Sequence, residues 1–164
     1  SSDVCSSDLW LRTGDLGFVL QGQVYITGRL KDLIIINGRN IHPQAVEWEV
    51  AEVEGVRKGN VVAFSVPGEA SEQLVVVCEA KEAGDHSALA SAVRARVQKE
   101  LSLSVADVIC LDAGALPKTS SGKLQRQKTR QQYLAGELGA EGSRTFGATA
   151  SRVTLARHVA RALW

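Results

Sequence analysis

Apolar residues fall along this chain in two patterns, short β-prone runs and longer stretches in which apolar positions recur every three or four residues. The short runs are typical of strands, and the longer spacing is typical of amphipathic helices. Strands are predicted at residues 18–20, 24–27, 33–36, 61–66, 74–80 and 108–111, and helices at residues 43–54, 89–101 and 125–138. The unbroken apolar stretch at 33–36 predicts a buried strand.

Local signals set the boundaries of several of these elements. Gln21-Gly22-Gln23 separates the first two strands and predicts a hairpin. Pro43 suits the first position of a helix, and Gly55 is placed to end that helix. The order hairpin, strand, helix, two strands, helix, strand, helix indicates an α+β fold in which helices cover a small sheet.

The chain has the size and composition of one small domain with tails. It holds 164 residues, of which 45% are hydrophobic and 23% are charged. A formal net charge of +1 gives no sign of a nucleic-acid partner, and the longest apolar runs are too short to span a bilayer. We therefore expect neither nucleic-acid binding nor a membrane span.

The cysteines and the two ends of the chain add further expectations. Cys5, Cys78 and Cys110 form no Cys-x-x-Cys pair, which indicates core packing and a reducing, cytoplasmic setting rather than disulfides or zinc. Residues 1–9 contain a near-repeat without periodicity, and we interpret them as non-native or a ragged edge. Residues 139–164 are interpreted as a linker and tail, with a possible short helix at 153–163.

The polar segment at residues 116–123 is the most informative stretch of the sequence. It reads Leu-Pro-Lys-Thr-Ser-Ser-Gly-Lys and lies between an apolar strand and a basic helix. Gly122 frees the backbone, the hydroxyls of residues 119–121 can bond phosphate oxygens, and Lys123 supplies a mobile positive charge. Such a loop suits a site where negative charge develops, although alone it is also compatible with a solvated loop.

Four motifs upstream accompany this loop in a fixed order. They are Arg12-Thr13-Gly14-Asp15, Gly28-Arg29-Leu30-Lys31-Asp32, Asn37-Gly38-Arg39-Asn40 and His42-Pro43-Gln44-Ala45-Val46-Glu47. With the Lys123 loop they resemble the closing motifs of the adenylate-forming, or acyl-activating, enzyme superfamily, most closely its fatty acyl-AMP ligase branch. The resemblance covers residues 10–136. It implies a C-terminal lid domain at 31–138, preceded at 10–30 by the end of the large-domain motifs and the approach to a hinge.

The resemblance also implies roles for residues around the hinge. Asp15 matches an aspartate that takes both ribose hydroxyls of a nucleotide, although an Asp here could also bond its own turn. Arg29 matches an arginine that contacts the nucleotide, the alternative being a surface ion pair with Asp32. Lys31 matches the hinge residue about which the lid swings between an adenylate-forming and a transfer pose.

A second group of residues is implied to face the acyl acceptor. Gly38, Arg39 and Asn40 are predicted to form a tight turn, which in relatives faces the tunnel of the nucleophile during transfer. Many coenzyme-A-using relatives carry a Lys at the position of Ile35, and its absence favours an acyl-carrier-protein acceptor. His42 is expected to be a structural turn residue. Glu47 is expected to stabilise the helix N-terminus or to orient the loop.

Lys123 matches the catalytic lysine of the adenylation step. In that step a carboxylate attacks the α-phosphorus of ATP while pyrophosphate leaves, so two anions must approach each other. A lysine that donates to both the carboxylate and the α-phosphate oxygens offsets this repulsion. Lys123 is therefore expected to be both catalytic and nucleotide-binding. Mg²⁺ is expected to accompany ATP, with no metal ligand identified in this chain.

These features predict a fragment of a fatty acyl-AMP ligase, inactive without its N-terminal domain. The complete enzyme would activate a fatty acid with ATP and pass the acyl group to an acyl carrier protein. Three alternatives remain: a long-chain fatty acyl-coenzyme A synthetase, a phosphate-binding module, and a non-catalytic domain that binds a nucleotide or a partner. Pro117 counts against the second, because a P-loop requires a Gly at that position.

Overall fold

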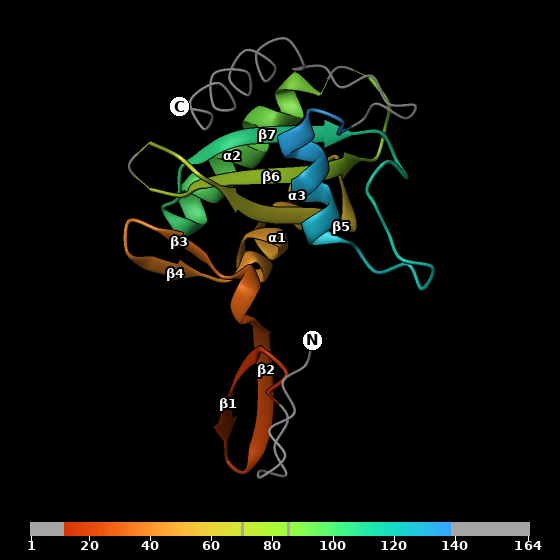
Figure 1. The fold of residues 1–164 in the computed structure, drawn as a ribbon. Helices are drawn as coiled ribbons and strands as arrows, with labels where there is room; N and C mark the ends of the chain where they lie inside the picture. Colours follow the sequence, from red (N-terminus) through yellow and green to blue (C-terminus); the bar gives the residue numbers. More distant parts are fainter. Residues whose placement is uncertain (1–11, 70, 85, 139–164) are drawn as a thin grey trace.

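The computed structural model describes residues 12–69, 71–84 and 86–138 (Figure 1). The expectations for residues 1–9, for Cys5 and for the tail at 139–164 with its helix lie outside the described residues. In chain order the elements are β1 (Asp15–Leu20), β2 (Gln23–Arg29), the 3-10 helix η1 (Leu30–Asp32), β3 (Ile34–Ile36), β4 (Arg39–Ile41), α1 (Pro43–Ala51), β5 (Val56–Val66), β6 (Gln73–Ala80), α2 (Ser87–Leu101), β7 (Val105–Leu111) and α3 (Arg126–Ala135).

A three-stranded sheet in the order β5-β6-β7 forms the centre of the molecule. β5 and β6 are antiparallel, with Val62 opposite Val77. β6 and β7 are parallel, with Cys78 opposite Cys110, and α2 makes the crossover between them. The sheet is covered on both faces, which explains why its strands are apolar at nearly every position.

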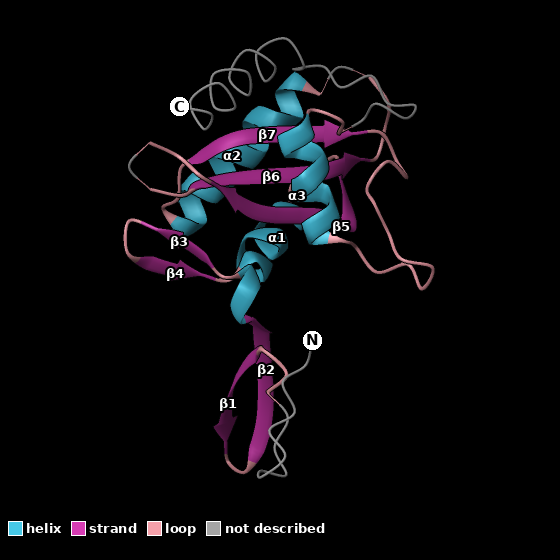
Figure 2. Ribbon diagram, viewed as in Figure 1, coloured by secondary structure: helices cyan, strands magenta, loops and turns pink. Residues whose placement is uncertain are grey.

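Helices cover both faces of this sheet (Figure 2), and each face buries a separate core. Helices α1 and α2 cover one face, where side chains such as Ala63, Val76 and Val97 pack together. Helix α3 covers the opposite face, where Tyr133 packs against Phe64 with ring centroids 5.6 Å apart. Successive residues of β5 and β6 alternate between the two cores, as the period of two in a strand requires.

The β1–β2 hairpin extends away from this body (Figure 1). Gln21 and Gly22 form its two-residue turn with φ of 51° and 77°, as the prediction of a hairpin requires. Its apolar side chains remain largely exposed; they are Phe18, Val19, Leu20, Val24, Tyr25 and Ile26. The hairpin thus makes no core of its own within the described residues.

Two predictions for residues 33–41 were wrong. The stretch 33–36 does not form a fully buried strand, because β3 pairs only with β4 and leaves Ile35 49% exposed while Ile34 is buried. The tight turn is formed by Asn37 and Gly38, with φ of 50° and 75°, and not by Gly38-Arg39-Asn40. Arg39 and Asn40 are strand residues of β4, because the two-residue Asn-Gly turn alone reverses the chain.

The other predicted elements are present with shifted ends. Pro43 occupies the first turn of α1, as expected, but the helix stops at Ala51, before Gly55. β7 begins three residues earlier than predicted, at Val105, because it pairs along the length of β6. Helix α3 stops at Ala135, where Gly136 takes the left-handed conformation with φ of 71°.

The structure confirms the predicted fold class, with three α-helices and small sheets in the described part of the chain. Cys78 and Cys110 are free and buried in the core, as expected. Among the described helices, none has the length and hydropathy needed to cross a membrane.

Candidate functional site

The loop that carries Lys123 is a small, internally bonded hairpin. Lys118 and Leu124 form an isolated antiparallel bridge at its base. Inside the loop, Thr119 N–H donates to Lys123 O at 2.8 Å, and Lys123 N–H donates to Thr119 Oγ1 at 3.0 Å. Gly122, with φ of 81°, makes the turn that brings these groups together. The hydroxyl of Thr119 therefore shapes the loop, whereas the sequence suggested that it was available to a phosphate.

The Lys123 side chain itself is exposed at the end of this loop. Within residues 12–69, 71–84 and 86–138, no carboxylate lies within ion-pairing distance of its ammonium group. The charge is therefore held on an ordered backbone while its head remains available to an external anion.

A buried carboxylate holds the N-terminal side of the loop. Glu79, fully buried in β6, accepts from Leu116 N–H at 3.1 Å and from Arg57 at 2.8 Å, with Lys118 at 3.9 Å. Burial alone raises the pKa of the Glu79 carboxyl, but backbone N–H donors and the two cations outweigh it, so the pKa lies below its usual value. The sequence analysis did not select Glu79, although a lone acid within an apolar strand was the available signal.

The two predicted ribose contacts are brought together by the first hairpin. Asp15 lies opposite Arg29 in the β1–β2 register, and Arg29 Nε is 3.1 Å from Asp15 Oδ1. The expected alternative for Arg29, a pair with Asp32, is not what the structure shows. Leu30 N–H donates to Gly14 O at 2.9 Å and ties the end of β2 to the start of β1.

The predicted hinge residue lies between this ion pair and the body of the domain. Lys31 is exposed in the short 3-10 helix η1. Arg29 flanks η1 on the hairpin side, and Asp32 is its last residue on the body side. Asp32 turns toward α3, where Arg126 donates to its Oδ2 at 2.7 Å.

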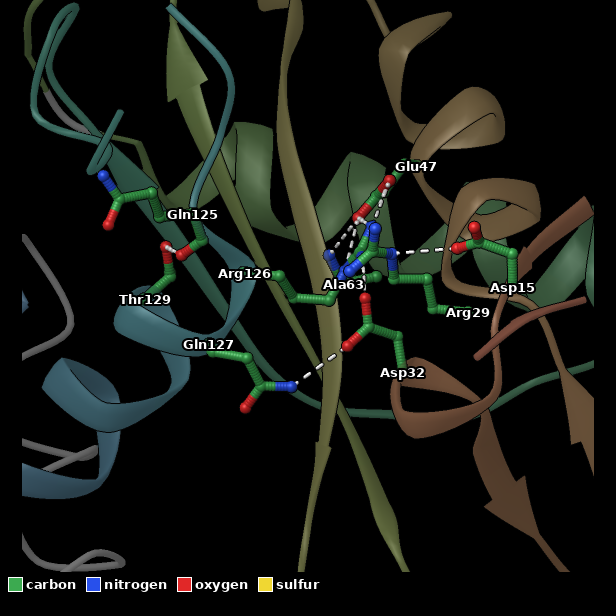
Figure 3. Close-up of polar contacts among 9 residues, drawn as sticks. All are labelled: Asp15, Arg29, Asp32, Glu47, Ala63, Gln125, Arg126, Gln127 and Thr129. Carbon is green, nitrogen blue, oxygen red and sulfur yellow. Dashed lines mark hydrogen bonds and ion pairs between the residues drawn. The ribbon is translucent and has the colours of Figure 1, made fainter. Parts of the chain in front are cut away.

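Arg126 is the centre of a charged cluster that sequence reasoning missed (Figure 3). Its guanidinium donates to Asp32 and also to Glu47, with NH2 at 2.8 Å and 3.0 Å from the two Glu47 oxygens. Glu47 in addition accepts from Ala63 N–H at 3.0 Å, and Gln127 donates to Asp32 at 3.0 Å. The bonds of Glu47 therefore go to β5 and α3. The predicted role at the helix N-terminus would have required a bond to the first turn of α1 instead.

The predicted site residues form two groups in the structure. Asp15 and Arg29 lie on the β1–β2 hairpin, and no described contact joins them to Lys123. Figure 1 shows the Lys123 loop, in cyan at the right, and the hairpin on separate parts of the molecule. The η1 segment with Lys31 is the covalent connection between the hairpin and the body.

The predicted acceptor residues lie on a third feature, the β3–β4 hairpin. Gly38, Arg39 and Asn40 are exposed at or beside its turn. The exposed side chain of Ile35 lies on the neighbouring strand, and Ile35 N–H donates to Glu72 Oε2 at 2.9 Å. This hairpin therefore presents an apolar side chain, an arginine and a polar turn to the outside.

With this geometry in view, the chain can be compared with known proteins. The family described as "Disco-interacting protein 2-like, AMP domain" matches residues 31–143. A Caulobacter vibrioides protein, provisionally named as an acyl-CoA synthetase, is 45% identical over 139 residues, which are 83% of this chain and 24% of that protein. The long-chain-fatty-acid–AMP ligase FadD32 of Mycobacterium marinum is 39% identical, covering 79% of this chain and 24% of the ligase.

A solved structure agrees with these relatives. The structure reported under "Structural and Functional Studies of Fatty Acyl-Adenylate Ligases from E. coli and L. pneumophila" superimposes with a TM-score of 0.64 and 37% identity. The match covers 76% of this chain and 22% of that one. The chain belongs to the adenylate-forming enzyme family, and it spans about a quarter of the length of the curated relatives it matches.

Proposed function

We propose that this chain is the lid domain of an ATP-dependent ligase that activates a fatty acid as its acyl-adenylate. One observation carries the proposal. An ordered loop presents the exposed Lys123, while Asp15 and Arg29 lie on a separate hairpin across the η1 segment. Relatives named as a long-chain-fatty-acid–AMP ligase and, provisionally, as a fatty-acid–CoA ligase support the fatty acid as substrate.

In this proposal Lys123 acts where the acyl carboxylate meets the α-phosphate. A cation between the two anions reduces their repulsion and holds them in line for attack, and no proton transfer by the lysine is needed. Its exposed ammonium fits this role, since no carboxylate of the described residues is paired with it and would have to be displaced first. The fixed backbone around Thr119 and Gly122 limits the number of positions that the ammonium samples.

Asp15 and Arg29 are proposed to hold the ribose and phosphate of the nucleotide. The Asp15 carboxylate offers two acceptor oxygens to two ribose hydroxyls, and Arg29 offers planar donors at 3.1 Å from it. We assign them to residues 10–30, the end of the large domain, and the rest of the site to the body at 31–138. The exposed apolar side chains of the β1–β2 hairpin fit packing against that large domain.

Mg²⁺ is proposed to accompany the ATP phosphates. In the described residues, no group of three or more His, Cys, Asp or Glu side chains is placed to hold a metal ion. Lys123, Asp15 and Arg29 therefore act on the organic and phosphate groups of the substrates. Ligands for the metal belong to ATP and to the proposed large domain.

For the second step we propose an acyl carrier protein as acceptor, with a free coenzyme A acceptor as the alternative. The β3–β4 hairpin carries Gly38, Arg39 and Asn40, which the family places near the acceptor. Ile35 on the same hairpin is exposed and uncharged where many coenzyme-A-using relatives carry a lysine. A transfer assay in which carrier protein and coenzyme A compete for the same acyl-adenylate decides between the two.

The proposed role of Lys123 is tested in the complete enzyme by Lys123→Ala. The rate of acyl-adenylate formation, measured as the release of pyrophosphate, should fall by a factor of hundreds. A loss of this size is typical when one charged donor to the transition state is removed. Lys128→Ala is the matched control, because Lys128 is another exposed lysine nearby on α3. Full adenylation activity in Lys123→Ala would refute the role, and acyl-adenylate synthesis by this chain alone would contradict the division into domains.

A further inference from the structure

The η1 segment is held by an ion pair on each side. On the hairpin side, Arg29 pairs with Asp15 across β1 and β2. On the body side, Asp32 pairs with Arg126 at 2.7 Å. Lys31, between them, is the exposed residue that makes neither pair. Leu30 and Lys31 therefore lie between two residues whose side chains are held to different parts of the molecule.

The attachment on the body side is the more strongly built of the two. Asp32, Glu47 and Arg126 have side chains that are 10%, 17% and 19% exposed, whereas Arg29 is 55% exposed. The Arg126 guanidinium uses separate donors for Asp32 and Glu47, a forked geometry that only arginine provides. Partly buried charge-assisted bonds of this kind are stronger and more directional than surface ion pairs.

Arg126 is also close to Lys123 along an ordered path. It follows Lys123 by three residues and is the first residue of α3. Between them, Gln125 N–H donates to Pro117 O at 3.0 Å, and Leu124 pairs with Lys118 at the base of the loop. The same short segment is therefore joined to the Lys123 loop at one end and to Asp32 at the other.

We propose that Arg126 is a positioning residue that fixes Asp32, the first residue after the pivot, to the base of the Lys123 loop. A rotation at Lys31 then carries Lys123 as part of one rigid body instead of bending the segment that follows the pivot. Glu47 is the second anchor, because it holds the same guanidinium while accepting from Ala63 N–H on β5. This inference rests on the proposed adenylation function.

The proposal predicts a specific kinetic signature in the complete ligase. In Arg126→Ala the kcat of adenylation should fall roughly 10- to 100-fold, since a misplacement of about 1 Å remote from the reacting atoms can cost about 100-fold. The KM for ATP should change less than about twofold, because Asp15 and Arg29 lie before the pivot and are untouched. Arg126→Lys should recover only part of the loss, since lysine lacks the fork.

Arg96→Ala is the matched control. Arg96 donates to Glu49 at 2.7 Å and 3.0 Å and joins α2 to α1, but it contacts neither Asp32 nor the Lys123 loop. Its variant should keep kcat. Melting temperatures of all variants are measured in parallel, and kcat is compared at a temperature where every variant is folded. An equal loss of kcat in Arg96→Ala and Arg126→Ala would overturn the proposal.

A double variant separates positioning from a merely structural role. If Arg126 acts through Lys123, then Arg126→Ala should lower the residual adenylation rate of Lys123→Ala by less than about twofold. A further loss as large as in the wild-type background would overturn the proposal. If Arg126→Ala does not fold, Asp32→Asn removes the negative charge from the same contact and is tested in the same two backgrounds.

The controls also separate this proposal from the proposed function. If the unaltered ligase forms no acyl-adenylate, the proposed function fails. If it does, and Lys123→Ala abolishes the reaction while Arg126→Ala and Asp32→Asn leave kcat unchanged, only the positioning role fails.

Discussion

The β1–β2 hairpin and the β5–β7 sheet are both built from strands rich in apolar residues, but these residues are exposed in the hairpin and buried in the sheet. In the sheet, Leu74 to Cys78 are all fully buried between helices on both faces. In the hairpin, Val19 and Val24 are 68% and 70% exposed, and none of the described helices packs on them. A two-stranded hairpin without a covering layer is marginally stable, so the hairpin depends on further protein while the sheet does not.

The same contrast applies to the charges of the two regions. The body contains the partly buried Arg126 cluster and the fully buried Glu79, which fix one side of the pivot and both ends of the Lys123 loop. Among the described residues, the hairpin carries the ion pair between Asp15 and Arg29, whose side chains are 29% and 55% exposed. A firmly bonded body beside a weakly held hairpin fits the proposal of a lid that rotates as one unit.

The largest expected effect is a cavity in the sheet. Leu74→Ala should lower the free energy of unfolding by about 4 kcal/mol, because it removes a fully buried side chain from the core beneath α1 and α2. The measurement is chemical denaturation of the 164-residue chain. Leu20→Ala in the hairpin is the control, because Leu20 is exposed. It should change the free energy of unfolding by less than about 0.5 kcal/mol. Equal effects at the two sites would break the comparison.

Next in size is the loss of the buried charge that holds the Lys123 loop. Glu79→Gln should destabilise the chain by about 3 kcal/mol, since Arg57 and Lys118 lose the negative charge that both of them pair with. Because the folded-state pKa of Glu79 is lowered, its contribution is present above the unfolded value near 4.5 and is lost as pH falls through the folded value. The free energy of unfolding, measured between neutral and acidic pH, should therefore fall less steeply with decreasing pH in Glu79→Gln than in the unaltered chain. An equal pH dependence in the two proteins would contradict this.

A smaller, local effect is expected at the turn of the β1–β2 hairpin. Gly22 has φ of 77°, and an added Cβ would meet no atom within 4 Å, so the cost of Gly22→Ala is conformational only. We expect about 1–2 kcal/mol, confined to the hairpin. Amide hydrogen exchange should speed up in β1 and β2 and stay constant in β6. Gly22→Asn should destabilise the hairpin less than Gly22→Ala, because Asn tolerates this conformation. Faster amide exchange in β6 would show that the hairpin and the sheet unfold together.

The smallest effect on stability is expected at the exposed ion pair. Asp15→Asn should change the free energy of unfolding by less than about 1 kcal/mol, since the Arg29 partner is more than half exposed. In the complete ligase the same variant should nevertheless raise the KM for ATP, because the amide cannot accept from both ribose hydroxyls. A stability loss as large as that of Glu79→Gln would place this pair among the structural contacts of the body instead.

Much of the fold was predictable because its signals are local. The alternation in β5 and β6, the Pro at the start of α1 and the Gln-Gly turn of the first hairpin act within a few residues. The errors arose where pairing decided the outcome. β4 was missed because Arg39–Ile41 form a strand only by pairing with β3. Residues 33–36 were predicted to be fully buried because the sequence does not show that the side of β3 carrying Ile35 stays exposed.

The site divides in the same way. The resemblance of the motifs to the adenylate-forming family singles out Asp15, Arg29, Lys31 and Lys123, and the structure places the side chains of the first two 3.1 Å apart. Their roles stay predictions. Glu79 and Arg126 were not found, because each acquires its meaning from partners that lie far away in sequence.

The sequence by itself determined most of the strands and helices, since periodicity and turn chemistry are properties of neighbouring residues. Its motifs marked Asp15, Arg29 and Lys123 as candidate site residues through a family resemblance. Only the tertiary structure decided that Arg126 lies between Asp32 and Glu47, which are 94 and 79 positions away along the chain. The physical reason is that α3 docks on the sheet through apolar packing, and this packing, not local spacing, sets where its first side chain points.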